Sequence, residues 1–178
     1  MSDVLTLLKH DHDQVEALLQ RFDGLTPADR DGYLCEVVHT LVGHEVAEEV
    51  VVYPLVRDEA PEGDAVANAR LAEQSEAEQL LAELESKSTD TAEFTTKFAL
   101  LRSAVLAHAK AEESTVFPLL ESSTTTEERQ ELGARYTKAK DRAPTHPHPH
   151  APDTPPGNTL MGPVAAIFDR ARDAIHRV

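Results

Sequence analysis

The sequence HEVAEEVVVYPLV, residues 44–56, returns as HAKAEESTVFPLL at residues 108–120. The two stretches lie 64 residues apart and share His, Ala, Glu, Glu, Val, Pro and Leu in register. Residues four positions apart leave an α-helix on the same face, so His44 and Glu48 point the same way, as do His108 and Glu112. Both faces are otherwise apolar. The repeat therefore predicts two helices that each turn a histidine and a glutamate into a common core.

Apolar residues at spacings of three and four continue outward from the repeat along most of the chain. They predict four long amphipathic helices, over residues 3–24, 27–57, 64–86 and 89–119. Short turns that contain Gly, Pro or Asp join these helices. The predicted fold class is all-α, an up-down-up-down antiparallel four-helix bundle.

The helix starts carry recognisable signals. Asp3 is a plausible N-cap, and Pro27 suits the first turn of the second helix. Thr89–Asp90 followed by Glu93 predicts a capped start of the fourth helix. Thr124 with Glu127 predicts a capping box that opens a short fifth helix, which extends to about residue 142.

The last part of the chain differs in composition. Seven of the eleven prolines fall between residues 144 and 163, around the sequence THPHPH. Proline at this density favours extended backbone. We expect a helical bundle over residues 1–142, a Pro/His-rich linker or strap over 143–162, and an amphipathic helix over 163–178. The histidines of the strap either bind metal at the surface or lie along the bundle.

Composition excludes several classes of function. The 178 residues carry 17 basic and 32 acidic side chains, a net charge of −15, which disfavours nucleic acid and anionic membranes. Only 4% of the residues are aromatic, and no apolar run approaches the ~20 residues that span a bilayer. The N-terminus lacks a secretion signal, and the single cysteine, Cys35, cannot pair within the chain. We therefore expect a cytoplasmic protein, with its oligomeric state open.

Histidines on the apolar faces point to a metal. His12 lies between Leu8 and Val15 on the first helix, whereas His10 lies about 200° away and should face solvent. Three inward histidines, two of them with a glutamate four residues on, would be costly to bury uncompensated, and a di- or trivalent cation offsets that cost. In the alternative, these side chains satisfy one another by hydrogen bonds in a metal-free scaffold.

These phrases resemble the hemerythrin-like family, also called the HHE cation-binding domain. The matching phrases are HDHD around His12 and the two repeats, and the resemblance covers residues 2–120. It implies a non-haem di-iron centre, bridged by carboxylates and by an oxo or hydroxo group. By position, His12 and His44 would cap one iron, Glu48 and Glu112 would bridge, and His108 would serve the other.

The third helix departs from the family pattern. It reads AEQSEAEQ, with Gln74 where the resemblance implies a histidine. Glu73 or Glu78 could replace that ligand, or Gln74 could bind weakly through its carbonyl or orient a water. We expect the second metal to be held less tightly. The neighbouring acids Glu45, Glu49 and Glu113 are expected at the surface, and Tyr53 in the core or close to the metals.

Two functions follow from this site. The first is a binding protein that takes up oxygen, nitric oxide or peroxide for sensing, storage or the handling of oxidative stress, as the resemblance implies. The second is a di-iron oxidoreductase that decomposes peroxide or oxidises ferrous iron, a direction favoured by the carboxylate-rich second position. Whether the protein is an enzyme stays open at this stage.

Overall fold

The computed structural model describes residues 2–59, 61–151, 165 and 169. Its elements are α1 (Val4–Arg21), the 3-10 turn η1 (Phe22–Gly24), α2 (Pro27–Ala47), the π-helical turn η2 (Glu48–Val52), α3 (Tyr53–Glu59), α4 (Gly63–Glu85), α5 (Ala92–Ser123) and α6 (Thr126–Lys140). No strand occurs in the described ranges, which confirms the all-α class. None of the described helices is long and apolar enough to cross a membrane.

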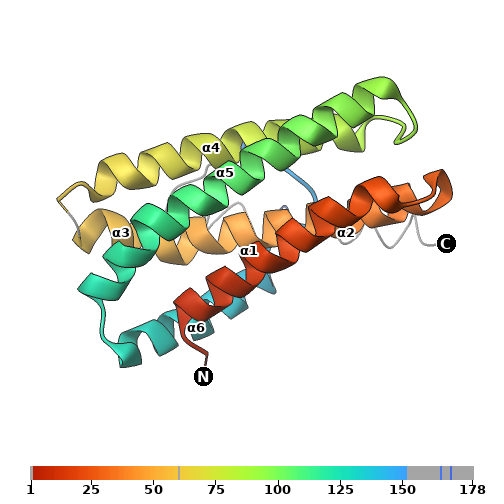
Figure 1. Ribbon diagram of the computed structural model, residues 1–178. Coiled ribbons are helices and arrows are strands. Elements are labelled where there is room, and N and C mark those ends of the chain that lie inside the picture. Colours follow the sequence, from red (N-terminus) through yellow and green to blue (C-terminus); the bar gives the residue numbers. More distant parts are fainter. Residues whose placement is uncertain (1, 60, 152–164, 166–168, 170–178) are drawn as a thin grey trace.

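The long helices pack against one another along their lengths. Figure 1 shows α1, α2 with its continuation α3, α4 and α5 as elongated neighbours, with the chain turning back between successive members. Contacts join α4 to α5 and to α3, and α1 to α2 and α5. Helix α6 packs on α1 and α2, outside the other long helices. The result is a helical bundle with an added fifth helix.

Two of the predicted helix starts are confirmed and two are shifted. The Asp3 carboxylate accepts from the Leu5 N–H at 2.8 Å, and Pro27 stands in the first turn of α2. Helix α5, by contrast, is capped by Thr91, which accepts from the Phe94 N–H at 3.1 Å, and Glu93 pairs with Lys87 instead of closing a capping box.

The capping box of α6 is likewise one residue later than predicted. It joins Thr125 and Glu128, because the hydroxyl of Thr124 is already bonded to the Leu120 carbonyl at the end of α5. Both shifted starts come from neighbouring threonines that compete for the same role.

The helix predicted over residues 27–57 is not continuous. At η2 the N–H of Tyr53 bonds to the carbonyl of Glu48, five residues back, and Pro54 follows directly. A π turn adds a residue to the helical repeat and changes where the following side chains point. No such turn interrupts α5 at the second copy of the repeat. The break lies beside the polar side chains of the core.

The core consists of two apolar clusters with polar side chains between them. One cluster includes Val15, Leu41 and Val105, and the other includes Leu8, Ala47 and Val116. Along every long helix the chain passes from one cluster to the other through a polar residue. We call the buried polar residues at this level the polar layer: His12, His44, Glu48, Gln74, His108 and Glu112.

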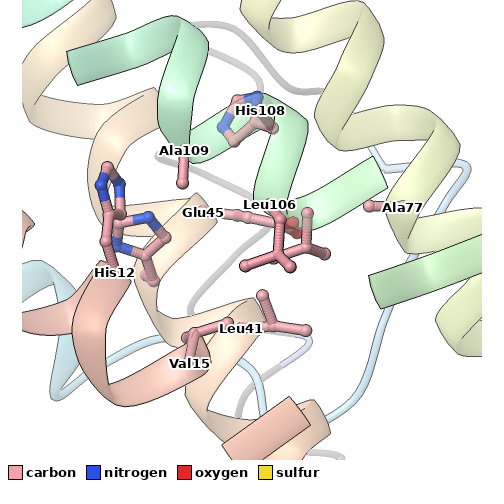
Figure 2. Close-up of a pocket in the computed structure, with 10 residues that line it drawn as sticks. His12, Val15, Leu41, Glu45, Ala77, Leu106, His108 and Ala109 are labelled. Atoms are coloured by element: carbon pink, nitrogen blue, oxygen red, sulfur yellow. The ribbon is translucent and has the colours of Figure 1, made fainter. Parts of the chain in front are cut away.

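A pocket opens beside the polar layer. It encloses about 390 Å³ including its opening to solvent, and Figure 2 shows His12, His108 and Glu45 around it. Apolar side chains such as Val15 and Leu106 form much of the remaining wall. All three histidines of the polar layer line this pocket.

The chain after α6 lies against the bundle as far as residue 148. Pro144 and Pro147 are buried, and the backbone N–H of His148 donates to Glu78 at 2.7 Å. His146 contacts Glu85 through Nδ1 at 2.6 Å. The rest of the predicted strap (143–162) and, apart from residues 165 and 169, the predicted C-terminal helix (163–178) lie outside the described residues.

Candidate metal centre

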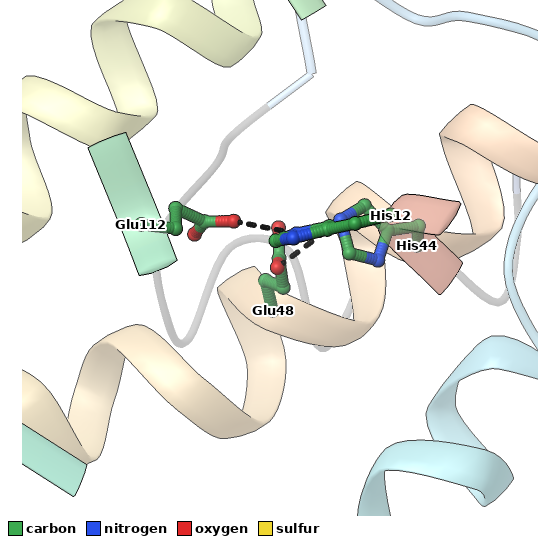
Figure 3. Close-up of side chains that lie close together, drawn as sticks. All are labelled: His12, His44, Glu48 and Glu112. Carbon is green, nitrogen blue, oxygen red and sulfur yellow. Dashed lines mark hydrogen bonds and ion pairs between the residues drawn. The ribbon is translucent and has the colours of Figure 1, made fainter. Parts of the chain in front are cut away.

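Four buried side chains converge in the polar layer, and they come from α1, from the continuous segment of α2 and η2, and from α5. His12 comes from α1, His44 from the last turn of α2, Glu48 from η2 and Glu112 from α5. One ligand atom from each lies within 4.8 Å of every other, and Figure 3 shows the four side chains meeting. Imidazole nitrogens and carboxylate oxygens in this mixture suit iron and other transition metals.

The helix geometry explains why these residues meet. Each of the histidines occupies a core position of its helix, where the neighbouring turns carry Leu8 and Val15 on α1 or Leu41 and Ala47 on α2. Burial of those apolar side chains fixes the rotation of each helix and so turns the polar residues inward. The layer is a consequence of the same stripes that form the two apolar clusters.

All three histidines are held in the same orientation. The outer nitrogen Nδ1 of each ring has a fixed partner: Glu113 at 3.0 Å for His12, the Tyr136 hydroxyl at 2.7 Å for His44, and Glu73 at 2.9 Å for His108. The inner nitrogen Nε2 faces a glutamate, at 3.2 Å for His12 and His44 and at 3.5 Å for His108. Metal-binding histidines in proteins show this division, with one nitrogen anchored and the other free for the ion.

Three atoms of the layer have no hydrogen-bond partner among the residues that the structure describes. They are Oε1 of Glu48, Oε1 of Gln74 and Nε2 of His108, and all three are inaccessible to solvent. Buried polar atoms of proteins are nearly always paired, so three unpaired metal-ligand atoms at one level require an explanation. A cation bound among them would satisfy their lone pairs, and the residues present therefore fit a metal centre.

The two central carboxylates differ in their electrostatics. Burial and the nearby charge of Glu112 raise the pKa of Glu48 well above its ordinary value. Burial would also raise the pKa of Glu112, but hydrogen bonding to His12 and the charges of the surrounding histidines outweigh it and lower the pKa. Glu112 is thus the carboxylate on which the histidines converge.

The pKa values of His12 and His44 are shifted in opposite directions. Burial opposes protonation of both, yet the hydrogen bonds of His12 to Glu112 and Glu113 overcome it and raise the pKa of His12. For His44 burial dominates and the pKa is lowered. Because a metal binds the neutral imidazole, protons compete with the metal more strongly at His12 than at His44.

Tyr53 and Gln74 connect the two carboxylates. The Tyr53 hydroxyl donates to Glu112 at 2.7 Å and lies 3.4 Å from Glu48. The amide nitrogen of Gln74 donates to Glu48 at 2.7 Å and to the Tyr53 hydroxyl at 2.8 Å. Gln74 therefore lies in the polar layer, at the level predicted for the helix-α4 ligand, with its carbonyl oxygen unpaired.

The other two predicted ligands of α4 lie elsewhere. Glu73 is half-exposed, pairs with Arg70 and contacts the outer nitrogen of His108, so it supports that ring from behind. Glu78 is also partly exposed and accepts the backbone N–H of His148. The structure thus brings His12, His44, Glu48, Glu112, Gln74 and His108 together and leaves Glu73 and Glu78 at the margin.

Sequence reasoning placed one acid wrongly and missed two residues. Glu45 is buried, with 6% of its surface exposed, although it was expected at the surface. Glu49 and Glu113 are partly exposed, and Glu113 contacts Nδ1 of His12 at 3.0 Å. Asp11 and Tyr136 adjoin His44, yet neither was a candidate. Asp11 belongs to the HDHD phrase and carried a signal, whereas Tyr136 comes from a helix 92 residues further along and carried none.

A helical bundle with a buried layer of histidines and glutamates defines a metal-binding helical protein. Consistent with that class, the sequence model of the "Hemerythrin HHE cation binding domain" matches residues 3–120. The chain belongs to this family. An uncharacterized hemerythrin-like protein of Schizosaccharomyces pombe is 30% identical over 143 residues, which are 80% of this chain and 70% of that protein.

A second relative is more distant. A protein of Nostoc named DNA nickase is 28% identical over 141 residues, 79% of this chain but only 40% of that protein. No solved structure matches the chain significantly. The family and the buried His/Glu cluster together identify a metal-binding protein.

Proposed function

We propose that the polar layer holds a di-iron centre that binds a small ligand such as oxygen, nitric oxide or peroxide, for sensing, storage or the handling of oxidative stress. The observation that carries this proposal is the common orientation of the three histidines, each anchored at Nδ1 and presenting Nε2 to a buried glutamate. Iron, when bound, supplies the electrons and the open coordination position that these ligands require.

The residues divide into two sets around Glu112. His12, His44 and Glu48 would hold one iron, and His108 with the carbonyl of Gln74 would hold the other, with Glu48 and Glu112 shared. Tyr53 fixes the shared carboxylates by its hydrogen bonds. The second set has fewer strong ligands, so its iron should be the more easily lost.

The pocket supports access of a small ligand. Its lining includes all three histidines, and its walls are mostly apolar, which suits an uncharged diatomic molecule. Glu45 is the exception, because its buried carboxyl lines the same space.

That exception favours a second candidate function. A buried carboxyl beside the pocket offers a group that can take up or release a proton, which the oxidation of ferrous iron or the decomposition of peroxide requires. The alternative proposal is therefore a di-iron oxidoreductase. In both cases we propose a cytoplasmic protein, in keeping with its single cysteine, and one without a nucleic-acid partner, which the net charge of −15 disfavours.

Metal analysis tests the proposal first. Protein purified from iron-supplied cells should contain about two irons per chain, as in other bundle-core di-iron sites. A folded protein with no metal after iron reconstitution would refute it.

A second experiment separates the two functions. Oxygen is added to the reduced, iron-loaded protein, and peroxide is added to a separate sample. A stable and reversible charge-transfer band supports ligand binding, whereas steady consumption of peroxide without such a band supports the enzyme.

A further inference from the structure

Helix α6 lies outside residues 3–120, the range that matches the family, yet it reaches the metal centre. Its Tyr136 is 1% exposed, and the hydroxyl oxygen lies 2.7 Å from Nδ1 of His44. The same hydroxyl donates to Asp11 at 2.7 Å, and Asp11 also accepts from the ammonium of Lys140 at 2.7 Å. Four residues thus form one chain of hydrogen bonds that ends on His44.

The protons of this chain can be counted. Asp11, paired with Lys140, is an acceptor only. Tyr136 has a single hydroxyl proton and gives it to Asp11, so its oxygen must accept at the other contact. The donor there is the Nδ1–H of His44. The lone pair of the neutral ring is therefore on Nε2, which faces Glu48 Oε1 at 3.2 Å.

We propose that Tyr136, supported by Asp11 and Lys140, is a positioning residue that fixes His44 in the Nδ1–H tautomer and presents Nε2 to the metal. Helix α6 then contributes a supporting residue to the metal centre. This inference rests on the proposed function, since the partner of Nε2 is the metal. It adds an anchor from outside the family's matched range.

The anchor of His44 differs from those of the other two histidines. Glu113 and Glu73, which hold His12 and His108, have side chains 35% and 38% exposed, so water competes for their hydrogen bonds. Tyr136 and Asp11 are buried, and a hydrogen bond to a buried partner is more costly to lose. Of the three rings, His44 is the one held from within the core.

The close packing of α6 against its neighbours is consistent with a specific contact between Tyr136 and His44. A Cβ at Gly43, the residue before His44, would lie 3.4 Å from the side chain of Lys140, and one at Gly133 would lie 2.2 Å from the carbonyl oxygen of Ser2. A side chain at residue 43 would make an ordinary contact with Lys140, whereas only glycine fits at residue 133, where α6 lies directly against the N-terminal chain. That packing allows Lys140 and Tyr136 to reach Asp11 and His44.

The test uses the full chain and two substitutions. Tyr136→Phe removes the hydroxyl and keeps the ring. Tyr33→Phe is the matched control, because the buried Tyr33 hydroxyl has no hydrogen-bond partner within the described ranges of the chain. Asp11→Asn is a second variant that keeps Tyr136 in place but lets its hydroxyl turn toward His44. Long-range ¹H–¹⁵N NMR of the metal-free protein reads the tautomer, with His44 assigned by substitution.

We expect His44 in the Nδ1–H form in the wild type and in Tyr33→Phe, and a mixed or Nε2–H form in Tyr136→Phe and Asp11→Asn. Anaerobic titration with Fe²⁺ should show about 10–100-fold weaker binding at the tighter site in Tyr136→Phe, the range seen when supporting partners of metal ligands are removed. A purely structural tyrosine would change stability without changing the tautomer.

The outcomes separate the two proposals. A wild type with His44 protonated on Nε2, or a Tyr136→Phe variant with tautomer and Fe²⁺ affinity unchanged, overturns the inference. A wild type that shows the Nδ1–H form but binds no Fe²⁺ refutes the proposed function instead, because the tautomer is read without metal.

Discussion

The two copies of the repeat, residues 44–56 and 108–120, have the same spacing of His, Glu and Pro but serve the polar layer differently. In the first copy His44 and Glu48 both belong to the four-residue cluster, and the π turn η2 follows His44. In the second copy only Glu112 belongs to it, and α5 continues unbroken. His108 keeps an unpaired Nε2 3.5 Å from Glu112.

The difference arises from what faces each copy. His44 is anchored by buried Tyr136, and a further histidine, His12, lies beside it with ring centres 5.1 Å apart. His108 is anchored by half-exposed Glu73, and α4 offers Gln74 where a histidine would complete the set. A sequence repeat thus specifies two similar halves, and on the proposed function we expect the surrounding helices to decide which half holds a metal more tightly.

The largest expected effect comes from removing one histidine of each copy. His44→Ala should abolish the tighter metal position, whereas His108→Ala should leave one metal ion per chain, because the cluster of four does not include His108. Metal content after gel filtration measures both, and His10→Ala on the exposed face of α1 is the control. Equal loss in the two variants would show that the copies are equivalent.

The second prediction concerns the half of the site that contains His108 and Gln74. Gln74→His should raise the affinity of the second position about tenfold or more, because imidazole replaces a weak amide ligand at the same level of the layer. Competition with a chelator measures the change, and Gln79→His on the exposed side of α4 is the matched control. A second metal held no more tightly than in the wild type would place the missing ligand away from residue 74.

Much of the fold could be predicted from the sequence, because the apolar stripes are local signals. The stripes and helix caps located the long helices to within a few residues, apart from the break that divides the helix predicted over residues 27–57 into α2, η2 and α3. The π turn could not be predicted, since both copies of the repeat have the same spacing and only one is broken. Its position depends on packing in three dimensions and not on a pattern along the chain.

The candidate site could be predicted in part for the same reason. His12, His44, Glu48, His108 and Glu112 stand on apolar stripes, and the burial of all five follows from that placement. The burial of Glu45 and the contact of Glu113 with His12 could not be predicted in this way. Each acid follows a polar core residue and faces a neighbouring helix, and the apolar stripes do not show how close that helix lies. Tyr136 meets His44 only through tertiary packing.

A third prediction concerns the support of His108. Arg70 pairs with Glu73, which in turn contacts Nδ1 of His108. Arg70→Met should weaken the second metal position by a few-fold and leave the first unchanged, since Glu73 is partly exposed and water replaces part of the lost contact. Stepwise Fe²⁺ titration separates the two positions, with Arg57→Met as the control. A change at the tighter position would show that the two halves are coupled.

The smallest effect is expected at one of the positions where the copies differ, Glu45 against Ala109, and both of these residues line the pocket. Within the described part of the chain Glu45 has no hydrogen-bond or ion-pair partner, and burial, with the charge of Glu78 next, raises its pKa well above the ordinary 4.5. Glu45→Leu should therefore stabilise the metal-free protein by about 1 kcal/mol at neutral pH, a rise of about 2–4 °C in Tm.

The pH dependence of that gain follows from the direction of the shift. Above pH 4.5 the folded chain keeps the Glu45 proton while the unfolded chain releases it, so the wild type loses stability as the pH rises. The advantage of Glu45→Leu should thus be greatest at neutral pH and shrink as the pH falls toward 4.5. Thermal unfolding of both proteins in chelator across that range measures it. An advantage that does not vary with pH would mean that Glu45 is ionised in the folded protein, with a pKa near its ordinary value.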